Sequence, residues 1–141
     1  MTGKVSGRLA RLIKRYESKG DFTYASVSEF QLKEAEQKLG VKLPAQYIDF
    51  LKQYGHGGIA GIEIIGVGIN GNLLFVNETL KYRKYGLAVN LIVVENCDEW
   101  LYCIDCNTGN VVSWSDGDVE NSYSSFDDFL LDRFADAIEN L

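Results

Sequence analysis

Two cysteines, Cys103 and Cys106, have the spacing of a Cys-x-x-Cys motif, which can serve as a redox dithiol or as half of a zinc site. A redox dithiol needs a thiolate that a helix N-terminus stabilises, whereas these cysteines fall in or just after a predicted strand. Strand alternation turns positions three apart to opposite faces. A structural zinc site needs four ligands, and only Cys97 and the distant His56 could complete the set. We therefore predict free thiols, no bound metal and no cofactor.

A glycine pattern and the single histidine are the next candidates. The sequence GVGING, residues 66–71, matches the G-x-G-x-x-G of dinucleotide-binding folds, which follows a strand and opens a helix. Here it leads into the apolar segment NLLFV, so we interpret it as the turn of a β-hairpin. His56 follows a predicted helix and has no nucleophile near it in the sequence. This position favours a capping or surface role over catalysis.

A group of carboxylates with two tryptophans is the third candidate. The group comprises Asp98, Glu99, Trp100, Trp114, Asp116, Asp118 and Glu120. Paired carboxylates can hydrolyse glycosides only at a defined separation in a cleft. The simplest interpretation is solvated turn acids beside core tryptophans. The functional interpretation is a protein-binding patch in which the tryptophans are anchors and the acids form the rim. Antiparallel strands place their ends close together, so the two acidic turns are expected to share one edge of the sheet.

The elements that would hold these residues in place begin with helices. Apolar spacing, a capping box at Ser28 and a proline suited to a first helical position indicate where the helices lie. Residues 125–141 carry a second Ser-initiated cap followed by an apolar face. The predicted helices are residues 6–19, 28–40, 44–54, 77–86 and 125–141, with Pro44 starting the third.

Between these helices the pattern changes to strands. The predicted strands are residues 62–68, 73–77, 87–95, 100–105 and 110–115, and the first two are expected to form a hairpin around INGN. The joints after the third and fourth strands also resemble hairpin turns. Helices, then a meander of strands, then a helix indicate an α+β fold with a mostly antiparallel sheet. We expect a single domain over residues 1–141.

The composition limits the classes of partner. The chain has 141 residues and a formal net charge of -6. A negative surface repels phosphate backbones and anionic lipid, which argues against direct nucleic-acid binding, and it attracts basic proteins. No run approaches the roughly 18 apolar residues of a membrane span, and the basic start lacks the apolar core of a secretory signal. The sequence therefore predicts a cytoplasmic protein.

Residues 28–58, SEFQLKEAEQKLGVKLPAQYIDFLKQYGHGG, resemble the N-terminal signature of the SMI1/KNR4, or SUKH, superfamily. The family pattern is a capped helix ending in Leu-Gly, an apolar corner closing on Leu-Pro, an aromatic-rich helix and then glycines. The matching residues are Leu39, Gly40, Leu43, Pro44, Tyr47, Phe50, Leu51, Tyr54, Gly57 and Gly58. The later strands, with Asp105 at the usual aspartate, and the closing helix with Phe126, Phe129 and Leu130 are also similar.

The resemblance implies an SMI1/KNR4-like fold, a Leu-Pro corner that is structural, and no enzymatic activity. Cys106 stands where many members carry Ser or Thr, which argues against a shared dithiol function. Bacterial members are mostly immunity proteins that bind and neutralise a cognate secreted toxin domain, often a basic nuclease, and residues 54–68 and 76–87 resemble the subgroup paired with LXG-type toxins. Fungal members are scaffolds in cell-wall signalling, so an interaction module is the alternative. Neither the toxin nor the oligomeric state follows from the sequence.

Overall fold

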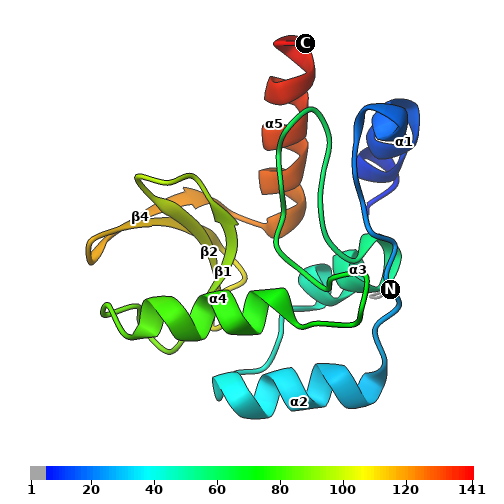
Figure 1. Ribbon diagram of the computed structural model, residues 1–141. Helices are drawn as coiled ribbons and strands as arrows, with labels where there is room; N and C mark the ends of the chain where they lie inside the picture. The colour runs from blue at the N-terminus through cyan, green and yellow to red at the C-terminus, as the bar shows by residue number, and fades with distance from the viewer. Residues whose placement is uncertain (1–5) are drawn as a thin grey trace.

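A computed structural model describes residues 6–141 and places four α-helices before a four-stranded sheet and one after it (Figure 1). The predicted α+β class with a C-terminal helix is confirmed. No helix within the described range has the length and apolar character of a membrane span. In chain order the elements are α1 (Gly7–Tyr16), the 3₁₀ turn η1 (Glu17–Lys19), α2 (Glu29–Leu39), α3 (Ala45–Tyr54), α4 (Leu74–Arg83), β1 (Leu91–Asn96), β2 (Leu101–Asp105), β3 (Val111–Ser115), β4 (Asp118–Tyr123) and α5 (Phe126–Glu139).

The α2 helix begins at the capping box that the sequence predicts. The Gln31 backbone N–H donates to Ser28 Oγ at 3.1 Å, and the Ser28 N–H donates to Gln31 Oε1 at 3.0 Å. Gly40 ends the helix with φ 69°, a left-handed conformation that costs glycine little. The first predicted helix, residues 6–19, is shorter as an α-helix because it stops at Tyr16 and finishes in η1.

The corner between α2 and α3 is built from Leu43 and Pro44. Pro44 has φ −64° and ψ 144°, so it is the N-cap of α3 and stands one position earlier than predicted. Leu43 is buried, and its N–H donates to Glu36 Oε2 at 2.8 Å, which ties the corner back to α2. The apolar stripe of α3 is buried as predicted, and it comprises Tyr47, Phe50, Leu51 and Tyr54.

The hairpin predicted across residues 62–77 is wrong in its second half. The chain does turn back, and Val67 pairs with Leu73 in a single antiparallel bridge. It then enters α4 at Leu74, so the helix predicted to start at Asn77 begins three residues earlier. A short apolar run fits a strand or a buried helix equally well. Packing against β1 favours the helix here, because a helix places Phe75, Val76 and Thr79 on one buried face.

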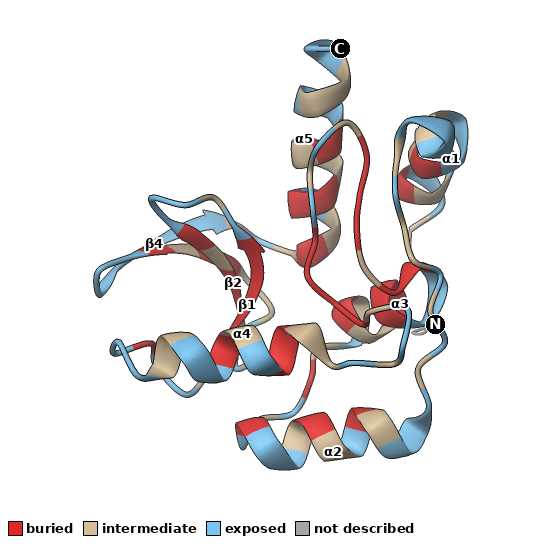
Figure 2. Ribbon diagram, in the orientation of Figure 1, coloured by how far each residue is buried: buried red, intermediate tan, exposed pale blue. Residues whose placement is uncertain are grey.

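Four strands form one antiparallel sheet in the order β1-β2-β3-β4. Three of them match predicted strands, and β4 was not predicted because its residues are polar and mostly exposed (Figure 2). The sequence does contain its signal. Asp116 and Gly117 have φ of 49° and 94°, so they form the tight two-residue turn for which Asp-Gly is a favoured pair.

The two faces of the sheet carry different helices. On one face Trp114 packs edge-on against Tyr82 of α4, with ring centroids 6.1 Å apart. On the other face Tyr102 packs against Phe129 of α5, with centroids 5.1 Å apart. Figure 1 shows α4 and α5 against the sheet, with α1 beyond α5. Residues that face α5 and residues that face α4 therefore reach different parts of the surface.

A β-bulge in β1 decides which face Glu95 joins. The register passes from Val93 opposite Cys103 to Glu95 opposite Tyr102, so Val94 is an extra residue. In a regular strand Glu95 would share the face of Val93, because residues two apart point the same way. The bulge instead turns Glu95 to the face of Tyr102 and α5.

The α5 helix starts at the predicted cap, where Ser125 Oγ accepts from the Asp128 N–H at 3.1 Å. The first four residues of its predicted apolar face are buried, and they are Phe126, Phe129, Leu130 and Phe134. The face does not continue in full to the end of the chain, since Leu141 is exposed. The last turn of α5 extends past the core (Figure 2).

Candidate protein-binding site

Two acidic turns lie together at one end of the sheet, as predicted. The β1–β2 turn and the β3–β4 turn are at the same end, because Leu101 at the start of β2 is opposite Trp114 near the end of β3. A hydrogen bond joins them directly, in which Ser115 Oγ donates to the Glu99 carbonyl oxygen at 3.2 Å. The term acidic end is used below for Asp98, Glu99, Asp116, Asp118 and Glu120.

Local hydrogen bonds and backbone geometry shape the β1–β2 turn. Asp98 has φ 69°, a conformation that Asp tolerates better than most residues, and its N–H donates to Asn96 Oδ1 at 2.8 Å. The Cys97 N–H closes the turn on the Trp100 carbonyl oxygen at 2.9 Å. The turn therefore holds its acids outward, and each member of the acidic end is exposed.

The two tryptophans lie on different sides of the sheet. Trp114 is 6% exposed and faces α4, so its side chain offers almost no surface to a partner. Trp100 is 37% exposed, and its ring stands edge-on to Tyr102 with centroids 6.2 Å apart. The register also places Glu120 in the row of Tyr102. Trp100 is thus the tryptophan that adjoins the exposed carboxylates.

A hollow of about 480 Å³ next to the acidic end brings in residues that the sequence analysis did not group with it. Asp98 and Asn96 line it together with His56, Glu63 and Glu78. The added carboxylates extend the negative surface past the β1–β2 turn. These residues are far apart in the chain, and no local pattern connects them.

His56 has a structural role at the edge of this hollow. Its Nδ1 accepts from the Gly66 N–H at 3.0 Å, and its Nε2 lies 2.9 Å from Glu63 Oε2. The ring thereby holds together two parts of the irregular segment that leads from α3 to α4. This differs in detail from the predicted cap or surface role, because the ring is largely covered by the segment it ties.

A buried ion pair lies beneath the acidic end. Arg133 of α5 donates to both Glu95 oxygens, through Nε at 2.8 Å and Nη2 at 2.6 Å. Its guanidinium carbon is 5.4 Å from the centre of the Tyr102 ring. The hydrogen bonds to Glu95 raise the pKa of Arg133. This bidentate pair fixes α5 to the sheet close to the β1–β2 turn.

The thiols are held in their neutral form. Burial raises the pKa of Cys97 to about 11, of Cys103 to about 12 and of Cys106 to about 11. The three cysteines are free, and residues 6–141 contain no group of three or more His, Cys, Asp or Glu side chains placed to hold a metal ion. A nucleophilic or redox cysteine needs a lowered pKa, which is the opposite shift.

Native protein should therefore react slowly with iodoacetamide at pH 8, since the thiolate forms only as the pH approaches the raised pKa values. Alkylation followed by mass spectrometry should show rapid labelling of all three cysteines only in denaturant. Metal analysis of protein purified without chelator should give no stoichiometric zinc. One zinc per chain that disappears in Cys103→Ser would show that the cysteines are ligands after all.

The chain matches the family model SUKH_5, described as SMI1-KNR4 cell-wall, over residues 9–135. The matched range starts in α1 and ends in α5, so it includes the Leu-Pro corner and the four strands. It also contains both acidic turns and the ion pair beneath them.

Proposed function

The chain belongs to the SMI1/KNR4 (SUKH) family, and from this premise we propose that it is an immunity protein which binds and neutralises a cognate toxin domain. The family is generally non-enzymatic and includes immunity-type proteins. The proposed toxin domain is basic, with a nuclease as the leading class. The acidic end would bind it, and no catalytic step would be involved.

The observation that carries this proposal is the meeting of two acidic turns at one end of the sheet. Their contact through Ser115 and Glu99 makes them one surface instead of two separate loops. Trp100 supplies a partly exposed aromatic side chain beside the carboxylates, which is the composition of a binding hot spot with a charged rim. The buried pair of Glu95 and Arg133 supports this surface from below.

The charge of the acidic end fits a nuclease domain. A nuclease must be positive where it holds phosphates, and carboxylates can cover that surface in place of the nucleic acid. Opposite charges also speed the encounter of the two proteins. The rate should fall as salt rises, because exposed charges are screened beyond about 10 Å at 0.1 M salt.

The thiols and His56 support a non-enzymatic role. Raised pKa values keep the cysteines from acting as nucleophiles. His56 is engaged by Gly66 and Glu63, and its role in the fold accounts for its position. His56→Ala is therefore compatible with binding as long as the protein folds.

Reversing charges at the acidic end should slow association with the toxin. The double variant Glu99→Lys with Asp118→Lys avoids the left-handed positions Asp98 and Asp116, so it should keep the fold. We expect an association rate at least about tenfold lower, as for electrostatically steered pairs. Surface plasmon resonance with the product of the gene upstream of this one, at low and high salt, gives the rate.

The matched control is Asp136→Lys with Glu139→Lys near the end of α5, which changes the net charge equally. It should associate nearly as fast as the wild type if the acidic end is the docking surface. Equal rates for both double variants would mean that only the net charge matters. Wild-type binding by the Glu99→Lys/Asp118→Lys protein at low salt would place the toxin elsewhere.

A second candidate function comes from the family description, which names the cell wall. In this alternative the chain is an interaction module for cell-wall or signalling partners. Co-expression separates the two, because an immunity protein rescues growth of cells that make the upstream toxin. An interaction module would give no rescue, and its partner would be unrelated to the neighbouring gene.

A further inference from the structure

The α1 helix carries a row of positive charge on a protein whose net charge is -6. Arg8, Arg11 and Arg15 stand at i, i+3 and i+7, the spacing of one helix face. All three are exposed. Over seven residues the row extends about 10 Å along the helix, at 1.5 Å per residue.

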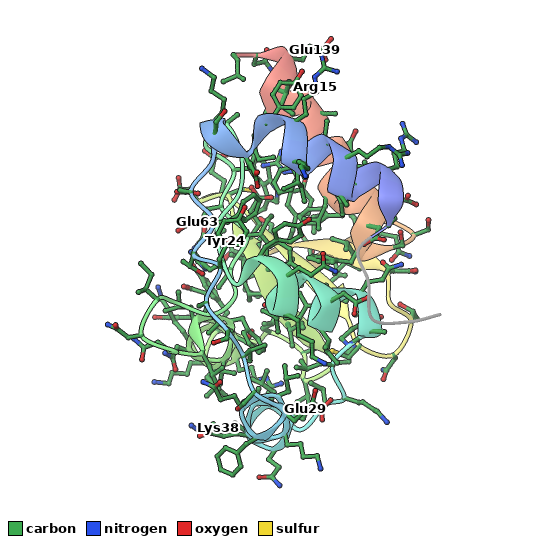
Figure 3. All side chains as sticks on the ribbon, turned by 90° about the vertical axis from the view of Figure 1, so that its right-hand side faces the viewer. Arg15, Tyr24, Glu29, Lys38, Glu63 and Glu139 are labelled. Atoms are coloured by element: carbon green, nitrogen blue, oxygen red, sulfur yellow. The ribbon has the colours of Figure 1, made fainter. Side chains whose placement is uncertain are left out.

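This row forms one wall of a groove of about 740 Å³ between α1 and α5. Its apolar lining comes from both helices, through Leu12 of α1 and Leu131 and Ala135 of α5. In Figure 3 the α1 helix runs across the face of α5, and Arg15 belongs to the last turn of α1. The groove therefore has an apolar floor and a cationic wall.

The arginines are not neutralised by ion pairs within the described part of the chain. None of the three forms an ion pair with another of residues 6–141. Arg15 does contact the Tyr16 ring, at 5.5 Å from its centre.

The opposite wall carries two carboxylates, and each accepts a hydrogen bond from a residue outside the groove. Asp132 accepts from the Tyr123 hydroxyl at 2.6 Å, and Asp128 accepts from Ser124 Oγ at 3.3 Å. Neither bond removes the negative charge, and neither carboxylate forms an ion pair with the three arginines. The groove is therefore cationic along α1 and anionic along α5.

We propose that the groove between α1 and α5 docks an amphipathic helix of a protein partner. The carboxylates of that helix would lie along Arg8, Arg11 and Arg15. Its leucine-like side chains would rest on Leu12, Leu131 and Ala135. A helix matches the row because acidic residues at i, i+3 or i+4, and i+7 repeat with the same rise as the arginines.

Three other occupants fit less well. A single small anion would need donors that converge on one point, whereas these arginines are spread along a line. A lipid surface would need exposed apolar residues on α1, but Leu9 and Ile13 are buried in the core. A nucleic acid carries phosphates along its whole length and would also meet Asp128 and Asp132, whereas a helix can keep its carboxylates on the flank that faces the arginines.

This site is separate from the acidic end and opposite in charge. In Figure 1 the α5 helix lies between the sheet and α1. A basic toxin bound at the acidic end would leave the groove free. The inference therefore stands or fails independently of the proposed immunity role, and it predicts a second, acidic partner.

The test uses a fluorescently labelled, helical peptide of about 15 residues with glutamates on one flank and leucines on the adjoining stripe. Fluorescence anisotropy with the full chain should show saturable binding that weakens as salt rises. Arg8→Gln with Arg11→Gln should weaken it at least about tenfold. Ala135→Trp, which fills the floor and changes no charge, should weaken it to a similar extent.

The matched control is Lys14→Gln with Lys19→Gln, which removes two exposed positive charges from the same segment outside the groove. It should stay within roughly twofold of the wild type if the groove is specific. An equal loss of peptide affinity in both double variants would mean that the peptide responds to net charge and not to the groove. A glutamine version of the peptide should not bind.

Three further results would overturn the proposal. The first is no saturable binding of the acidic peptide by folded wild-type protein. The second is tighter capture by a single-stranded DNA oligomer or by phosphatidylglycerol vesicles than by the peptide. The third is self-association in sedimentation velocity that Arg8→Gln with Arg11→Gln abolishes, because the occupant would then be a second copy of this chain.

Discussion

Replacing Arg133 with methionine is expected to lower the free energy of unfolding by about 3–5 kcal/mol, the usual cost of stranding a buried charge. The variant leaves Glu95 buried at 5% exposure without either of its two guanidinium hydrogen bonds. Methionine fills much of the volume of arginine, so lost packing adds little. Urea unfolding followed by circular dichroism measures the change. Because Arg133 fixes α5 beneath the β1–β2 turn, the affinity of the acidic end for the proposed toxin domain should also fall.

Two comparisons separate the ion pair from general effects. Arg15→Met removes an exposed arginine that forms no ion pair within residues 6–141, and it should change stability by less than about 0.5 kcal/mol. The double variant Glu95→Leu with Arg133→Met removes both charges and should recover most of the loss. If Arg133→Met is as stable as the wild type, Glu95 must reach water or another donor when its partner is gone.

Phe50→Ala should destabilise the protein by about 3–5 kcal/mol, since it leaves a cavity in a dense aromatic core. Phe50 is fully buried on α3, and its ring centroid lies 5.9 Å from Phe126 of α5 and 6.4 Å from Tyr47. Leu43→Ala in the corner should cost about 2–5 kcal/mol for the same reason. Both values come from the midpoint and slope of urea unfolding.

The same substitution at an exposed site provides the control. Phe30 on α2 is 77% exposed, so Phe30→Ala should change the free energy of unfolding by no more than about 0.5 kcal/mol. Similar losses for Phe30→Ala and Phe50→Ala would contradict the placement of α3 in the centre of the fold. Because Phe50 is fully buried, loss of partner binding in Phe50→Ala would reflect loss of the fold and not loss of a direct contact.

The acidic end and the arginine row of α1 lie on different surfaces of the molecule. The acidic end sits on β-turns whose backbone is closed by local hydrogen bonds. The arginine row lies on α1, across α5 from the sheet. A rigid core between them, with Phe50 near its centre, would let two partners bind without competing for one site.

Several features followed from the sequence by itself, and they are the local ones. The capping box of Ser28 and Gln31, the stop at Gly40 and the buried stripe of α3 were predictable because each depends on residues within one or two turns of a helix. The strands β1, β2 and β3 were also predictable, since tight turns separate apolar runs there. The helix, Leu-Pro corner, aromatic helix and glycines of residues 28–58 indicated the family.

Other features depended on contacts that no local pattern records. The run from Leu73 to Asn77 became helical because its helical face packs on β1, and β4 formed from polar residues because the Asp116–Gly117 turn returns the chain to β3. Trp114 was placed in the core by the strand register, which left Trp100 as the tryptophan beside the acids.

The sequence by itself determined α1, α2, α3 and α5, the capping box of α2, three strands, and the presence of two acidic turns, which meet only if their strands are neighbours. Tertiary structure decided how these parts face one another. The bulge at Val94 turned Glu95 to the face of α5, where Arg133 neutralises it. The groove beside Arg8 and Arg11 likewise exists only because α1 packs on α5. Local conformational propensity depends on a few neighbouring residues. Which face of a strand or helix is buried depends on the distant element that packs against it.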